Sequence, residues 1–79
     1  MTGRRVVKRL DARVLKAAGV HPLPQVLADL AALGPGEAYE LVTPHAPGHV
    51  LEKVGELGVD WASVELGPDE VLTTFTKRP

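Results

Sequence analysis

The sequence predicts an α+β fold, a two-layer α/β sandwich in which two helices cover one face of a mixed four-stranded sheet. Three observations lead to this prediction. Four short segments are rich in β-branched and apolar residues, two segments repeat apolar residues at helical spacing, and proline or glycine separates most of them. In order these segments read β-α-β-α-β-β, and right-handed crossovers then place both helices on the same face.

The first strand is predicted over residues 6–10 and ends at Asp11, because apolar residues there alternate with Lys8 and Arg9. The next segment, residues 11–19, fits either a loop or a short helical turn that Gly19 stops. Residues 20–24 are expected to be extended, since a proline disfavours the helical conformation of the residue before it.

The clearest helical pattern in the chain begins near Pro24, which suits the first turn of a helix because no partner is needed for its missing N–H. Gly34 is expected to take the left-handed position after this helix, and Pro35 prevents its continuation. The apolar positions recur at steps of three and four residues: Leu23, Val26, Leu27, Leu30 and Leu33.

The second half of the chain supplies one more helix and three strands. Trp61 is predicted to anchor the sheet to a helix, because it can bury more surface than any other side chain here. The segments are a strand at residues 38–43, a helix at 47–57 ended by Gly58, and strands at 61–66 and 71–76 joined by a hairpin loop at 67–70.

Composition indicates a single small globular domain over residues 1–79, with its core at about residues 6–77. Apolar residues make up 44% of the chain and charged residues 24%, which are ordinary values for a folded domain. The chain contains no cysteine. That excludes disulfides, a thiol nucleophile and cysteine-based zinc sites.

The N-terminal segment is basic and has no apolar core, so no signal peptide is predicted, and no apolar run approaches the length of a membrane span. We therefore expect a cytoplasmic protein that does not engage membranes. Net charge is −1, yet six basic residues lie within residues 4–16. With only three aromatic residues, none in a basic setting, we interpret these charges as solvated and expect no nucleic-acid partner.

The predicted topology gathers chemically capable side chains at one edge of the sheet. Strand carboxyl ends and helix N-termini meet at such an edge, which is where α/β proteins usually place a site. The residues expected along this rim are Asp11, Arg13, His21, His45 and His49.

Four interpretations of this rim remain open at the level of sequence. Arg13 near a helix start suits a carboxylate or phosphate. His45 and His49 have the spacing of two metal ligands on a helix, with Asp11 or His21 as a third. A histidine beside Asp11 suits acid–base chemistry. Alternatively, Asp11 and Arg13 pair with each other and the histidines face solvent. No metal or other cofactor is assigned.

A series of short motifs carries a family resemblance: Leu10-Asp11-Ala12-Arg13, Leu33-Gly34-Pro35-Gly36-Glu37, His45-Ala46-Pro47 and Trp61. From about residue 7 to residue 77 the chain resembles the family catalogued as domain of unknown function 2249 (DUF2249). That family is similar in turn to the TusA/SirA-like sulfur-carrier proteins. The resemblance implies a βαβαββ sandwich with strand order 1-2-4-3 and a last strand antiparallel to the rest.

The resemblance also bears on chemistry. The sulfur carriers hold a persulfide on the cysteine of a Cys-Pro-x-Pro motif, and here the matching stretch is His21-Pro22-Leu23-Pro24. An imidazole cannot carry a persulfide, so sulfur relay by this route is excluded for the chain alone. Family members joined to haemerythrin-like domains suggest redox or metal-linked partners. The DUF2249 pattern includes the positions of Asp11, Arg13, His45 and Pro47, but this chain has Pro44 and Ala46 where acidic residues are usual.

Together these observations predict a small, non-catalytic binding or accessory module whose rim takes a small anionic ligand or a protein partner. The alternative is a metal-dependent or histidine-based enzyme, or a redox accessory protein, that uses the same rim. A further alternative is a purely structural subunit that forms a homodimer through its open sheet face.

Overall fold

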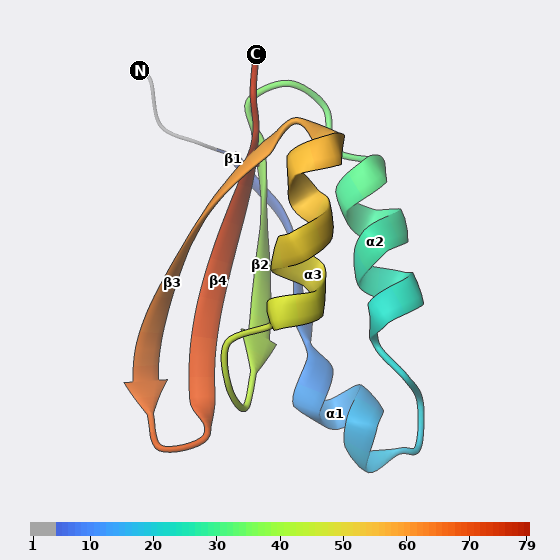
Figure 1. The fold of residues 1–79 in the computed structure, drawn as a ribbon, viewed down its shortest axis with the longest axis vertical. Coiled ribbons are helices and arrows are strands. Elements are labelled where there is room, and N and C mark those ends of the chain that lie inside the picture. Colours follow the sequence, from blue (N-terminus) through green and yellow to red (C-terminus); the bar gives the residue numbers. More distant parts are fainter. Residues whose placement is uncertain (1–4) are drawn as a thin grey trace.

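The computed structural model describes residues 5–79, which form one sheet with a layer of helices against it (Figure 1). In chain order the elements are β1 (Arg5–Asp11), α1 (Ala12–Ala17), α2 (Leu23–Ala31), β2 (Glu37–Thr43), α3 (Gly48–Lys53), the 3-10 helix η1 (Val54–Leu57), β3 (Val59–Gly67) and β4 (Glu70–Lys77).

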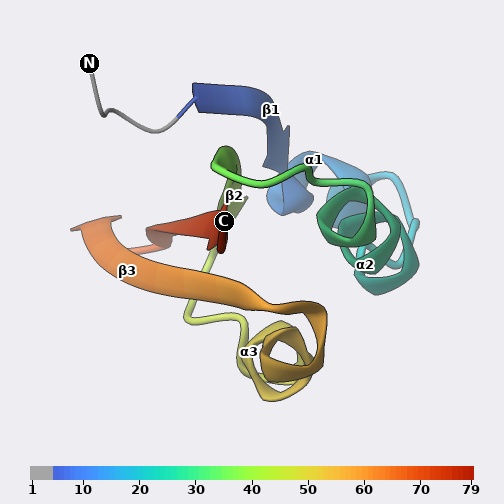
Figure 2. The same ribbon diagram turned by 90° about the horizontal axis from the view of Figure 1, so that it is seen from above.

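The strands are ordered β1-β2-β4-β3, which confirms the predicted α+β class and the order 1-2-4-3. β1 and β2 are parallel, whereas β4 is antiparallel to both of its neighbours. Figure 2 shows the sheet edge-on, with α2 and α3 on the same side of it. The right-handed crossover rule predicts this arrangement, because it returns each connecting helix to the same face.

The core lies between the sheet and the helices. Tyr39 on β2 is opposite Phe75 on β4, and their ring centroids are 6.3 Å apart. Both side chains are fully buried, and they pack in one cluster with Val26 and Leu30 of α2. The spacing of the apolar residues in α2 therefore puts them on one face of the helix, and that face packs against β2 and β4.

Of residues 11–19, for which the sequence permits either a loop or a helical turn, residues 12–17 form the short helix α1. The carboxylate of Asp11 accepts a hydrogen bond from the backbone N–H of Arg13 and so caps the helix start. Gly19 has a φ of +79° and follows the last turn. This left-handed residue ends the helix, as the sequence predicted.

Three predicted details of the other helices are wrong. Leu23, expected to be extended before Pro24, is the first residue of α2, and Pro22 before it already has helical angles, with φ of −77° and ψ of −19°. Gly34 does not take the left-handed position; Gly36 does, with a φ of +78°. The reason is that α2 already ends at Ala31, and the Gly34 N–H instead donates to the Glu37 carboxylate at 2.8 Å. The helix predicted at residues 47–57 is divided into α3 and η1, although Gly58, at a φ of +68°, ends it as expected.

Trp61 does not anchor the sheet to a helix, contrary to the prediction. β3 is the outer strand of the sheet, and along it Val59 is buried while Trp61 is 47% exposed. Trp61 is opposite Phe75 and so lies on the helix side, where it borders a hollow beside Leu51 and Val54 without being covered by them. Val59 is the β3 side chain that joins the core.

Candidate functional site

A pocket of about 140 Å³ lies where β2 ends and the chain turns into α3. Three other segments close it: α1, the connection from α1 to α2, and the first turns of α2. Segments that are distant in sequence therefore meet at the carboxyl end of β2. The volume suits a ligand of a few heavy atoms and lies below the range of about 300–1,000 Å³ typical of drug-sized ligands.

The inner wall of the pocket is apolar. It is formed by Leu41, Val26, Val50 and Ala12, all of which are buried. Thr43 closes the end of β2, and its hydroxyl donates to the backbone carbonyl of His45. This hydrogen bond ties the loop after β2 to the strand, which fixes the path of the chain past the pocket.

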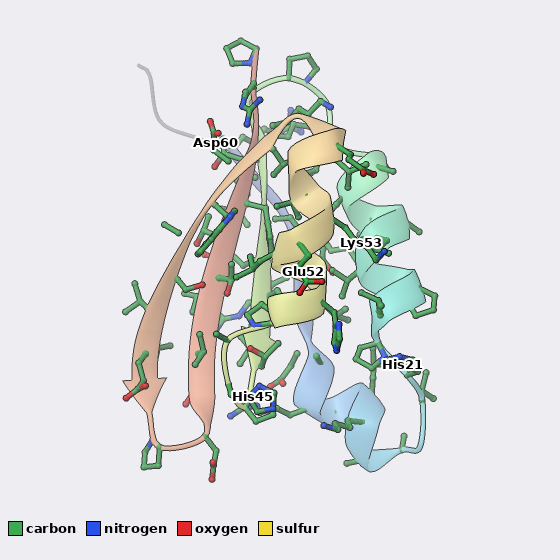
Figure 3. The ribbon with its side chains drawn as sticks, viewed as in Figure 1. His21, His45, Glu52, Lys53 and Asp60 are labelled. Carbon is green, nitrogen blue, oxygen red and sulfur yellow. The ribbon has the colours of Figure 1, made fainter. Side chains whose placement is uncertain are left out.

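The outer wall carries basic side chains. His21, His45 and His49 all line the pocket, together with Lys16 from the last turn of α1. His45 lies in the loop after β2 and His21 in the connection to α2, at the same end of the molecule (Figure 3). No aspartate or glutamate among the described residues lines this pocket. Four residues with basic side chains therefore line the pocket, and no described residue with a carboxylate side chain lies among them.

The structure places the other two predicted site residues, Asp11 and Arg13, outside the pocket lining. Arg13 Nε and Nη2 donate to the two Asp11 carboxylate oxygens at 2.9 Å and 2.8 Å. The same guanidinium also reaches the backbone carbonyl of Asp69 at 3.4 Å and lies 3.9 Å from the Glu70 carboxylate. Arg13 thus ties the start of α1 to the β3–β4 hairpin.

This pairing determines the ionisation of Asp11. Hydrogen bonds from the Arg13 side chain hold the pKa of the Asp11 carboxyl below its ordinary value, and the Arg13 backbone N–H adds to the effect. In register, Asp11 is opposite Val42, whereas the pocket is lined from β2 by Leu41 and Thr43, which point to the other face. The expected rim is therefore divided: the structure brings the three histidines together and leaves the Asp11–Arg13 pair on the other face.

Several basic residues of the N-terminal segment are paired with acids. In the part of the chain that the structure describes, three basic residues of this segment lie within 4 Å of an acid: Lys8 beside Asp29, Arg9 beside Glu40, and Arg13 beside both Asp11 and Glu70. Lys16 forms no ion pair with any residue in the range 5–79. The positive charge of Lys16 is therefore not neutralised by a described neighbour, unlike the charges of Lys8, Arg9 and Arg13.

The described residues do not form a metal site with three or more protein ligands. Among residues 5–79, no group of three histidine, aspartate or glutamate side chains converges in a way that could hold a metal ion. His45 and His49 line one pocket, but His45 precedes α3 and so does not share a helical face with His49.

Within residues 5–79, no helix is long and apolar enough to cross a membrane.

Lys16 is the pocket residue that reasoning from sequence missed. The sequence analysis treats Lys16 only as one of several N-terminal charges. Gly19 could have indicated its position, because a helix that ends at Gly19 has its last turn close to the segment that contains His21.

Comparison with known proteins gives one match. No curated protein and no solved structure matches the chain. The model of the family described as "Uncharacterized conserved protein (DUF2249)" matches residues 9–77, a range that includes all three histidines and every described helix. The expected likeness to the sulfur carriers stays a prediction. The chain belongs to the DUF2249 family.

Proposed function

We propose that the protein is a small binding module that takes a small anionic ligand, such as a phosphate or a short carboxylate, in the pocket at the end of β2. The observation that supports this is the set of residues that line the pocket: His21, His45, His49 and Lys16 accompany a mainly apolar wall, and no aspartate or glutamate of residues 5–79 is among them. Ammonium and imidazole N–H groups donate charge-assisted hydrogen bonds, which are the stronger ones available to an anion.

The apolar wall favours an anion that also has a small apolar part. Leu41 and Val26 are 1% exposed and offer no polar group to a ligand, so an alkyl chain would lie against them without loss of hydrogen bonds. A short-chain carboxylate meets both requirements, and inorganic phosphate meets only the first. The proposal therefore ranks butyrate above phosphate.

The proposal assigns binding and no reaction to this pocket. Thr43 is the lining residue with a hydroxyl, and that hydroxyl already donates to the His45 carbonyl. The carboxylate that would orient a histidine for acid–base catalysis, Asp11, is held by Arg13 on the other face of the sheet.

The bound anion can equally be a carboxylate of a partner protein, in which case the protein acts as an accessory module. The expected cytoplasmic location belongs to the same proposal, and cell fractionation tests it.

Calorimetric titration of butyrate and of inorganic phosphate tests the proposal. Lys16→Ala is expected to weaken binding about tenfold, because a hydrogen bond to a charged group contributes about 1.5 kcal/mol or more. Lys53→Ala is the matched control: it removes the same side chain from α3, outside the pocket lining, and is expected to leave affinity unchanged.

Arg13→Ala separates this pocket from the rim expected from sequence. The variant is expected to bind as the native protein does, since Arg13 does not line the pocket. Loss of binding in Arg13→Ala but not in Lys16→Ala would contradict the assignment. Absence of heat with both anions would reject a free small anion as the ligand.

A further inference from the structure

Within residues 5–79, the outer strand β3 has no strand paired to one of its two edges. It pairs with β4 on one side and forms the end of the sheet on the other. Of its nine residues only Val59 is buried, and residues 60–66 are exposed on both faces of the sheet. Three of these exposed side chains are large and apolar: Trp61 at 47%, Val64 at 56% and Leu66 at 51%.

The two edges of the sheet differ in how they are protected. β1, at the opposite edge, carries Arg5, Lys8 and Arg9 and has an irregularity in its register between Val6 and Lys8. Lysine, arginine and bulges are the devices that keep an edge strand from pairing with another chain. β3 contains no lysine, arginine or proline, and its register irregularity lies only at its last residues, between Glu65 and Gly67.

We propose that β3 is a self-association edge: two copies of this chain pair their β3 strands antiparallel across a two-fold axis. The two sheets then form one continuous sheet, and the axis, perpendicular to that sheet, keeps the helices of both copies on the same side. The contact is isologous, so it closes at a dimer and leaves the β1 edges at the two ends. Each basic β1 edge stays exposed to solvent.

The distribution of charge on β3 selects a second copy in this orientation. The start of β3 lies beside Lys77 and Arg78 of the β4 end and carries one acid, Asp60, whose carboxylate accepts a hydrogen bond from Arg78 Nε at 3.0 Å. One positive charge is therefore in excess there, and Glu65 lies near the other end of β3. Antiparallel pairing brings the Glu65 end of one copy to the end of the other that carries Arg78. A parallel pairing would instead place Glu65 of one chain beside Glu65 of the other chain, and such a contact between like charges is destabilising.

This interface is separate from the anion pocket. Neither Trp61 nor Val64 lines the pocket at the end of β2, and β3 is two strands away from β2 in the sheet. The inference therefore stands whether or not an anion binds. The protein also has a single tryptophan, and it lies at this edge, so its fluorescence reports on the interface alone.

Sedimentation equilibrium over a range of protein concentrations tests the proposal. The mass is expected to rise from the 8.4 kDa of one chain to twice that value and to go no further. Val64→Lys places a lysine at the edge and is expected to raise the dimer dissociation constant at least about tenfold. Val14→Lys is the matched control, because it replaces a valine that is 65% exposed on α1 and should leave the constant unchanged.

Two further measurements on the native protein test the dimer without relying on the Val64→Lys variant. Trp61 emission should shift to shorter wavelength as the native protein is concentrated, and backbone amides of β3 should exchange with solvent more slowly. Neither change is expected in Val64→Lys. A mass of 8.4 kDa at every concentration would overturn the proposal, as would equal effects of the two valine variants. A ladder of larger species would overturn it too, because it would indicate pairing of β3 with β1 in an open chain.

Discussion

Replacement of Tyr39 by phenylalanine tests how the sheet and α2 are held together. The Tyr39 hydroxyl is buried and donates to Asp29 Oδ2 at 2.9 Å, while Lys8 and Gln25 donate to Oδ1. The Asp29 side chain is only 13% exposed, so water replaces a lost donor poorly. Phenylalanine keeps the ring against Phe75 and removes only this hydrogen bond.

The expected cost of Tyr39→Phe is about 2 kcal/mol of unfolding free energy, because hydrogen bonds to charged groups contribute about 1.5–3 kcal/mol. For a domain of this length that lowers the melting temperature by about 10 °C. Urea unfolding followed by far-ultraviolet circular dichroism, at low protein concentration to limit self-association, measures the difference. Lys8→Met removes the exposed donor to the same carboxylate and should cost less than about 0.5 kcal/mol.

The effect of Tyr39→Phe should also depend on pH. Burial, together with the hydrogen bond to Asp29, raises the pKa of Tyr39 above its ordinary value. The stabilisation is therefore complete below the ordinary tyrosine pKa of about 10 and declines as pH rises toward the raised value, because only the unfolded chain releases the proton. The difference between native protein and variant should shrink above that pH. Equal stability losses in Tyr39→Phe and Lys8→Met at neutral pH would refute this reasoning.

Two other substitutions test local features of the fold. Asp11→Ala removes the cap of α1 and should cost about 1 kcal/mol in thermal unfolding, whereas Asp11→Asn should retain most of the cap. Because the pKa of Asp11 is lowered in the fold, its contribution should be present above the ordinary carboxyl pKa and be lost as pH falls through the lowered value. Gly58→Ala should cost about 1–2 kcal/mol, since φ is +68° there. Gly55→Ala, with open space around its Cβ and no positive φ, should be neutral, and a loss equal to that of Gly58→Ala would contradict the backbone argument.

The elements of the fold were predictable because their signals are local. The spacing of Leu23, Val26 and Leu30 is that of residues on one face of a helix. Gly58 signals a helix end because glycine readily takes the left-handed conformation found there. The strand order is less local, and here the family resemblance supplied it. The prediction for Trp61 fails because its residue type does not say whether its strand is central or outer in the sheet, and β3 is an outer strand.

The candidate site was predictable only in part. The end of β2 and the start of α2 were expected at one edge, which is why His21, His45 and His49 were grouped correctly. Asp11 was placed with them because it ends a neighbouring strand. Side chains alternate between the faces of a strand, however, so the face on which Asp11 lies depends on its register with β2, and sequence alone does not give that register.

The most direct test of the anion pocket is an NMR titration of the native protein with butyrate, following the side-chain resonances of the histidines and arginines. Binding in the pocket predicts that His21, His45 and His49 shift together and saturate at one common dissociation constant, while Arg13 does not move. Shifts confined to Arg13, or histidine resonances that stay fixed at saturating butyrate, would contradict it.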